Sequence, residues 1–143
     1  MFMGCDNMNQ YMCKAKRKDN GKWVYGYYVM KEDVIFKTKL HYILRQPEGD
    51  SLASWYPVDP GTLCRCTGIE DESGVVIFEN DIIEAWSEGI CARGVVQRRV
   101  DGLWIMYPAY QNDIMWGLCP NEHFKSSVEV VGNKFDNTEL MEE

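Results

Sequence analysis

The sequence predicts an all-β protein built from short antiparallel strands and tight turns. Two turn signals support this prediction: strand-like runs flank Asn20-Gly21 near the start of the chain and Asp101-Gly102 in its second half. Asn-Gly and Asp-Gly pairs favour two-residue hairpin turns, because these residues tolerate the positive φ angles that such turns need. Several short sequential strands in the second half favour a small barrel over a parallel sheet.

The first hairpin is expected from residues 11–18 and 22–30. Apolar side chains fall on both faces of its second strand, so we expect that strand to be covered on both sides. One face carries Trp23, Tyr25, Tyr27 and Val29, and the other carries Val24, Gly26 and Tyr28. A glycine inside a strand, such as Gly26, predicts a bulge or the close approach of another backbone.

The middle of the chain is less regular. Residues 37–44 are compatible with a strand or with one helical turn. Residues 46–61 contain three prolines and two glycines, which predicts a long loop. We expect Trp55 and Tyr56 in this loop to cover the fold, with exposure to a partner as the alternative.

The second half carries the remaining strands. Residues 81–86 predict one strand, residues 93–100 and 103–107 predict a hairpin, and residues 128–131 predict a short closing strand. Residues 112–125 predict a short helical turn or an excursion on the rim of the barrel.

Composition indicates a folded protein. The chain has 143 residues, 45% of them hydrophobic and 13% aromatic, which is enough for one domain with a core or for two small β lobes. No apolar run approaches the roughly 20 residues of a membrane span, and the first residues do not resemble a signal peptide. We therefore expect a cytoplasmic protein with no membrane partner.

Charge is distributed unevenly along the chain. Residues 1–65 hold ten Lys and Arg against seven Asp and Glu, whereas residues 66–143 hold five against fifteen. The acidic total of -7 disfavours a primary nucleic-acid binder. One face of the first strand carries Lys14, Lys16 and Lys18. This face is either a solvated strand surface or a docking patch for nucleic acid or for an acidic protein surface.

The six cysteines do not predict a metal site or disulfides. No pair has the Cys-x-x-Cys spacing of a zinc knuckle. Cys64 and Cys66 fall on one face of a strand and are expected to be free thiols. His41 and His123 lie beside aromatic residues and are interpreted as packing or surface residues. We expect no cofactor.

The segment Thr67 to Ile83, TGIEDESGVVIFENDII, has ordered turn, acidic and aliphatic positions. It resembles the signature of the YopX family of bacteriophage and prophage proteins. Further similar positions lie at residues 94–96, 102–105, 128–133 and 137–140. Asn80 stands where the family usually has glycine; if that position needs a positive φ, Asn is the least costly replacement.

The resemblance implies a fold but no established activity. It implies an SH3-like barrel in residues 61–143, with residues 1–60 as an N-terminal β-hairpin subdomain that includes the proline-rich loop. The two parts are expected to form one compact unit.

The acidic residues of the signature permit a catalytic or metal-binding interpretation. Asp71, Glu79, Asp81 and Glu84 supply carboxylates for a divalent cation or for acid–base chemistry. The competing interpretation is that these residues and Thr67 bond to nearby backbone amides in turns and define the fold. We favour the second interpretation, and no motif in the sequence indicates an enzyme.

The leading functional hypothesis is a non-catalytic protein-binding module. Its partner is expected to be a protein, including one of the bacterial host, with self-association as a variant. The candidate surface is an aromatic rim formed by Trp55, Tyr56, Trp86, Trp104, Tyr107, Tyr110 and Trp116. A nucleic-acid-binding module that uses the basic strand and a metal-dependent enzyme that uses the acidic signature are the alternatives.

Overall fold

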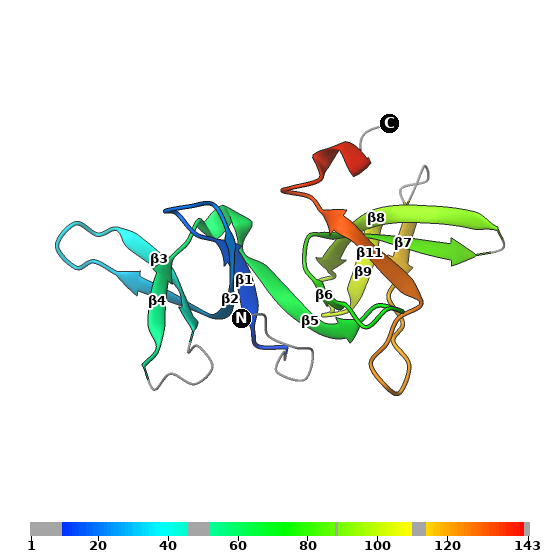
Figure 1. The fold of residues 1–143 in the computed structure, drawn as a ribbon, viewed down its shortest axis with the longest axis horizontal. Coiled ribbons are helices and arrows are strands. Elements are labelled where there is room, and N and C mark those ends of the chain that lie inside the picture. The colour runs from blue at the N-terminus through cyan, green and yellow to red at the C-terminus, as the bar shows by residue number, and fades with distance from the viewer. Residues whose placement is uncertain (1–9, 46–51, 88, 110–113, 142–143) are drawn as a thin grey trace. The chain divides into compact units, whose positions relative to one another are not determined.

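The computed structural model describes residues 10–45, 52–87, 89–109 and 114–141. These residues form strands and short 3-10 helices, without an α helix, so the all-β prediction is confirmed. The strands make two antiparallel sheets, in the orders β4-β3-β2-β1-β5-β6 and β10-β9-β8-β7-β11 (Figure 1). No helix in the described parts of the chain has the length and apolar character needed to cross a membrane.

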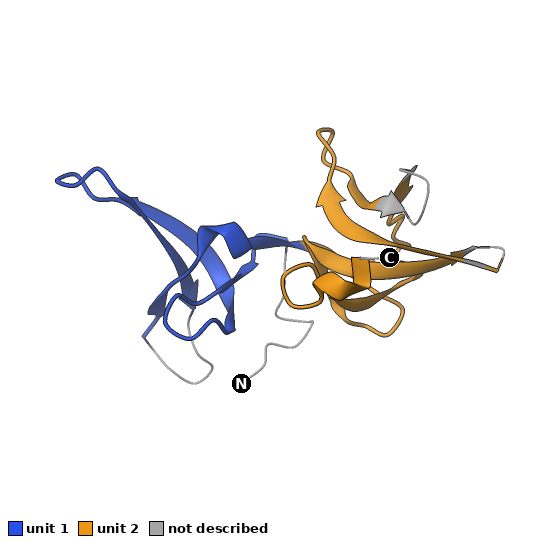
Figure 2. Ribbon diagram, turned by 90° about the horizontal axis from the view of Figure 1, so that it is seen from above, with its two compact units in different colours: residues 1–66 blue, residues 67–143 orange. Residues whose placement is uncertain are grey.

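The chain divides into two compact units, Met1–Cys66 (unit 1) and Thr67–Glu143 (unit 2), coloured separately in Figure 2. Strand β5, Cys64–Glu70, runs through the boundary between them. Across the described residues neither sheet closes into a barrel. The SH3-like assignment of the second half therefore stays a prediction.

Unit 1 begins with the predicted hairpin. Strands β1, Cys13–Lys16, and β2, Trp23–Glu32, pair antiparallel across a turn in which Gly21 has a φ of +70°. The alternation of β2 is confirmed, because its Val24 side is buried in the core of unit 1. The opposite side is less covered than predicted, since Tyr27 is exposed.

Gly26 lies where a second backbone approaches closely, as its position inside a strand predicts. A Cβ at Gly26 would lie 2.3 Å from the carbonyl oxygen of Leu44, on the neighbouring strand β3, Lys39–Arg45. Only glycine fits at this distance.

For residues 37–44 the sequence allows a strand or one helical turn, and the structure shows the strand β3 there.

The prediction of a long loop at residues 46–61 is wrong for its second part. Strand β4, Ser54–Pro57, pairs with β3, and a 3-10 helix, Pro60–Thr62, follows it. β4 is the outermost strand of its sheet. A proline is tolerated in a strand at such an edge because its missing N–H leaves no neighbouring strand without a donor.

Unit 2 contains a meander. Strands β7, Asp81–Ser87, β8, Ile90–Arg98, β9, Trp104–Ala109, and β10, Ile114–Gly117, pair in sequence, and β11, Val128–Asn133, returns beside β7. The short strand β6, Val76–Phe78, precedes β7, and a 3-10 helix, Thr138–Met141, follows β11.

The predicted turn at Asp101-Gly102 connects β8 to β9, and its glycine has a φ of +91°. For the described part of residues 112–125, the helical-turn alternative is wrong, because strand β10 forms at Ile114–Gly117; residues 118–125 form loops and turns, and their place on the rim of a barrel stays a prediction. Alternation explains this strand, because Trp116 packs against the core while Met115 is exposed.

Replacing Gly26 by alanine is expected to destabilise unit 1 by about 2 kcal/mol, because the new methyl group overlaps a backbone oxygen that cannot rotate away. Urea unfolding followed by circular dichroism measures this change. Gly21→Asn is the matched control in the same hairpin: no atom lies within 4 Å of its Cβ position, and asparagine tolerates a positive φ. Equal stability of the two variants would contradict the close-approach explanation.

Candidate functional site

The carboxylate of Asp71 is bonded to the backbone rather than directed toward a ligand. Its Oδ1 accepts hydrogen bonds from the amides of Ser73, at 2.9 Å, and Val75, at 2.8 Å. Its Oδ2 accepts a third from the amide of Val130 in β11, at 3.0 Å. The side chain is 1% exposed. Asp71 therefore joins the turn before β6 to the last strand of unit 2.

Three other signature residues also hold turns. The hydroxyl of Thr67 donates to the carbonyl of Ile77, at 2.7 Å, across the β5–β6 pair. Asn80 has a φ of +72°, in the left-handed region that asparagine tolerates better than most other side chains. The buried carboxylate of Asp81 accepts from the amide of Phe78, at 2.8 Å.

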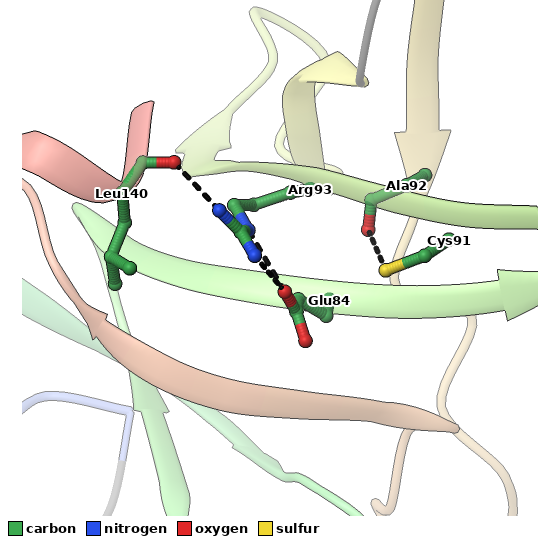
Figure 3. Close-up of polar contacts among 5 residues, drawn as sticks. All are labelled: Glu84, Cys91, Ala92, Arg93 and Leu140. Atoms are coloured by element: carbon green, nitrogen blue, oxygen red, sulfur yellow. Dashed lines mark hydrogen bonds and ion pairs between the residues drawn. The ribbon is translucent and has the colours of Figure 1, made fainter. Parts of the chain in front are cut away.

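Glu84 forms an ion pair on the outer face of unit 2, opposite its core. Arg93 reaches one carboxylate oxygen of Glu84 through Nε, at 2.8 Å, and through Nη2, at 2.5 Å (Figure 3). Its Nη1 donates to the carbonyl of Leu140, at 2.9 Å. The guanidinium therefore fastens the C-terminal 3-10 helix to strands β7 and β8.

These contacts do not support a metal site. In the described ranges, no three His, Cys, Asp or Glu side chains are placed to hold a cation. Cys13, Cys64 and Cys66 are buried, Cys91 is half-buried and Cys119 is exposed, all as free thiols, whereas Cys5 lies outside the described residues. His41 stacks on Tyr28 and bonds to its hydroxyl at 2.5 Å, in agreement with the packing interpretation.

The basic strand is not a uniform solvated face. Lys14 is only 7% exposed, and its ammonium lies 4.6 Å from the centre of the Trp23 ring. The ammonium of Lys16 lies 5.4 Å from the same ring, and only Lys18 of the three is exposed. Two of the three charges are thus engaged with an aromatic ring within unit 1.

The predicted aromatic rim is divided between the two units. Trp55 and Tyr56 belong to β4 in unit 1, and they point to opposite faces: Trp55 is exposed, and Tyr56 packs against the core. In unit 2, Trp104 and Trp116 pack against the core, Tyr107 is half-buried and Trp86 is 67% exposed. Tyr110 lies outside the described residues.

The structure places Trp55 in a different group of side chains, on the sheet of β2, β3 and β4. We call the side of this sheet that faces away from the core of unit 1 the aromatic face. Strand register puts Tyr27, Leu44 and Trp55 in one row across it, and Val29 and Tyr42 in the next. The full set is Tyr27, Val29, Lys31, Tyr42, Leu44 and Trp55.

Aromatic and cationic contacts order this face. Trp55 and Tyr42 meet edge to face, with ring centres 5.7 Å apart. The ammonium of Lys31 lies 4.2 Å from the centre of Trp55 and 5.9 Å from that of Tyr42. Cation–π contacts of this kind hold rings in place at the surface. The aromatic face is therefore an ordered, partly exposed apolar surface.

A pocket of about 290 Å³ adjoins the aromatic face. Tyr25, Tyr27 and Leu44 line it from this side of the sheet, and the other lining residues are Met12, Gly26, Arg45 and Ala53. The mixture of apolar walls and one arginine suits an apolar side chain beside an acceptor group.

Sequence reasoning identified Trp55 but not Tyr42 or Lys31. Tyr42 lies in residues 37–44, for which the sequence allows a strand or a helical turn. Without the register of strand β3, Tyr42 cannot be placed beside the edge strand β4. Had β4 been recognised, the alternation of Leu40, Tyr42 and Leu44 would have indicated a second apolar face on β3.

Asp71→Asn is expected to lower the free energy of unfolding by about 2 kcal/mol. The amide can accept from Ser73 and Val75 through its oxygen, but its NH2 group then meets the amide of Val130, so two donors face each other. Chemical denaturation of the whole chain measures the change. Asp101→Asn, in an exposed turn, is the matched control and should change stability by less than about 0.5 kcal/mol. Similar values for the two variants would show that the three-amide contact does not stabilise unit 2.

The thiol of Cys91 reports on the Glu84–Arg93 pair. Burial raises the pKa of Cys91, the carboxylate of Glu84 raises it further, and Arg93 acts in the opposite sense. Glu84→Gln removes a negative charge, so the pKa of Cys91 should fall and its thiolate fraction at pH 7.5 should rise. We expect faster alkylation by iodoacetamide, measured by mass spectrometry, with the exposed Cys119 as internal control. An unchanged Cys91 rate would contradict this electrostatic coupling.

Comparison with known proteins identifies the family of this chain. The family model described as YopX protein matches residues 12–142, which is nearly the whole chain. A search of curated proteins gave no match. The turn residues Thr67, Asp71, Asn80 and Asp81 lie within the matched range, and the chain belongs to the YopX family.

Proposed function

We propose that this YopX-family chain is a phage or prophage accessory protein that acts by binding another protein through the aromatic face of unit 1. The observation that carries the proposal is the ordered group of Trp55, Tyr42 and Lys31, which stays partly exposed on a sheet whose other side contributes Val24 and Ile43 to the core of unit 1. The proposed setting is the cytoplasm of the bacterial host.

The chemistry of the aromatic face favours a protein partner. Tyrosine and tryptophan dominate the residues that contribute most to protein–protein affinity, because each covers a large area with few rotatable bonds. Trp55 and Tyr42 already hold one arrangement through their mutual contact and through Lys31, so little side-chain freedom is lost on binding. The adjoining pocket offers a place for one apolar side chain of the partner.

The two alternatives have weaker support. A nucleic-acid site on the basic strand would need accessible ammonium groups, whereas Lys14 is buried beside Trp23. A metal-dependent enzyme would need converging carboxylates, whereas Asp71 and Asp81 bond to different turns and Glu84 pairs with Arg93. We therefore propose a non-catalytic role. The SH3-like description of unit 2 remains part of this proposal, supported by its meander of short strands.

A tagged capture experiment from lysate of the native host tests the proposal. The wild-type chain should retain a stoichiometric protein that survives nuclease treatment. Trp55→Ser should reduce its capture about thirtyfold, the effect of removing a residue worth about 2 kcal/mol. Trp86→Ser, which removes an exposed tryptophan from unit 2, is the matched control and should capture the partner normally.

Three results would contradict the proposal. Capture that disappears with nuclease would transfer support to the basic strand. Normal capture by a folded Trp55→Ser variant would remove the aromatic face as the site. Loss of capture in Trp86→Ser alone would move the site to unit 2.

A further inference from the structure

The turn between β2 and β3 exposes three consecutive large apolar side chains. We call residues Asp33 to Thr38 the hairpin tip. Val34, Ile35 and Phe36 are 87%, 83% and 74% exposed. In Figure 1 the tip is the light-blue loop that extends beyond β3 and β4 at the left of the view. Contiguous exposed apolar groups of this kind mark contact with a protein or a membrane.

The tip is ordered by its own polar groups. Oδ1 of Asp33 accepts from the amides of Ile35, at 2.9 Å, and Phe36, at 3.2 Å. The amide of Asp33 donates to the carbonyl of Thr38, at 2.8 Å. Donors that are satisfied inside the turn can leave water without losing a hydrogen bond, which entry into an apolar medium requires.

Lysines surround the apolar residues. Lys37 has a φ of +54°, a conformation that glycine would adopt without strain. Lys37 therefore places a positive charge at a position where the backbone favours glycine. Lys31 and Lys39 lie on the two adjoining strands, where Lys39 is opposite Glu32. Residues 31–39 thus hold three lysines against Glu32 and Asp33, a net charge of +1, and unit 1 as a whole carries more basic than acidic residues. The carboxylate of Asp33, by contrast, is turned toward the backbone of the tip.

We propose that the hairpin tip inserts into the interfacial layer of an anionic lipid membrane. Each of the three side chains is open to solvent over most of its surface, so a partner must surround the turn to bury them. The boundary between the headgroups and the acyl chains of a bilayer can surround a turn of any geometry, whereas a protein would need a deep pocket to bury all three side chains. Lys37 and Lys39 would then lie near the level of the phosphates, whereas the ammonium of Lys31 lies over the Trp55 ring.

This inference differs from the sequence-based expectation of no membrane partner. That expectation rested on the absence of a segment long enough to span a bilayer. A three-residue tip is far shorter, and its exposure depends on the turn that Asp33 organises, so hydropathy along the chain does not reveal it.

Co-sedimentation of the full chain with lipid vesicles tests the proposal. The wild type should bind vesicles of phosphatidylglycerol and phosphatidylcholine, and bind less at high salt or to phosphatidylcholine alone. Ile35→Ser/Phe36→Ser should weaken binding about tenfold for each side chain removed. Lys37→Gly removes a charge and relieves the backbone, so it should weaken binding about fivefold while the fold becomes no less stable.

Val100→Ser/Leu103→Ser is the matched control, because it removes two exposed apolar side chains from the β8–β9 turn of unit 2. This variant should bind vesicles as the wild type does. The proposal is overturned if the wild type stays in the supernatant with anionic vesicles, or if the Ile35→Ser/Phe36→Ser variant binds equally well. Capture of a host protein through the tip, without vesicle binding, would also overturn it.

Discussion

The buried carboxylate of Asp71 is the contact on which the architecture of unit 2 depends. It binds two amides of its own turn and one amide of β11, which lies more than fifty residues later in the chain. A carboxylate out of water is costly unless its oxygens accept several hydrogen bonds. The turn between β5 and β6 and the return of β11 therefore form together, with the core of Ile77, Ile83 and Val128 between them.

This constraint explains why the acidic signature is better understood as a folding element than as a catalytic one. A carboxylate that serves a reaction must keep an oxygen available to a ligand. Both oxygens of Asp71 are instead committed to backbone amides, and Glu84 is held by Arg93, which also fastens the C-terminal 3-10 helix. We therefore place the proposed binding surface where the structure leaves ordered apolar groups exposed, on the sheet of β2, β3 and β4.

Sequence alone predicted the elements whose signals are local. The Asn20-Gly21 and Asp101-Gly102 turns need only neighbouring residues to be recognised, whereas a positive φ at Asn80 was suggested only through the family resemblance. Strand β4 was not predicted because the prolines of residues 46–61 resemble a loop, and only its edge position makes Pro57 compatible with a sheet. The aromatic face was missed because Tyr42 and Trp55 meet through cross-strand register. The burial of Lys14 depends likewise on Trp23 across the β1–β2 pair, which no single-strand pattern contains.

The two units differ in charge as well as in the roles that we propose for them. Unit 2 holds five basic and fifteen acidic residues, and unit 1 holds ten and seven, so the change of sign coincides with the boundary at Cys66 and Thr67. A strongly charged unit keeps a protein soluble by repulsion between copies. Unit 1 can then display the aromatic face and the hairpin tip, which would otherwise promote association of a neutral domain. The acidic composition of unit 2 is, in this view, what permits unit 1 to expose the apolar surface through which we propose that it binds.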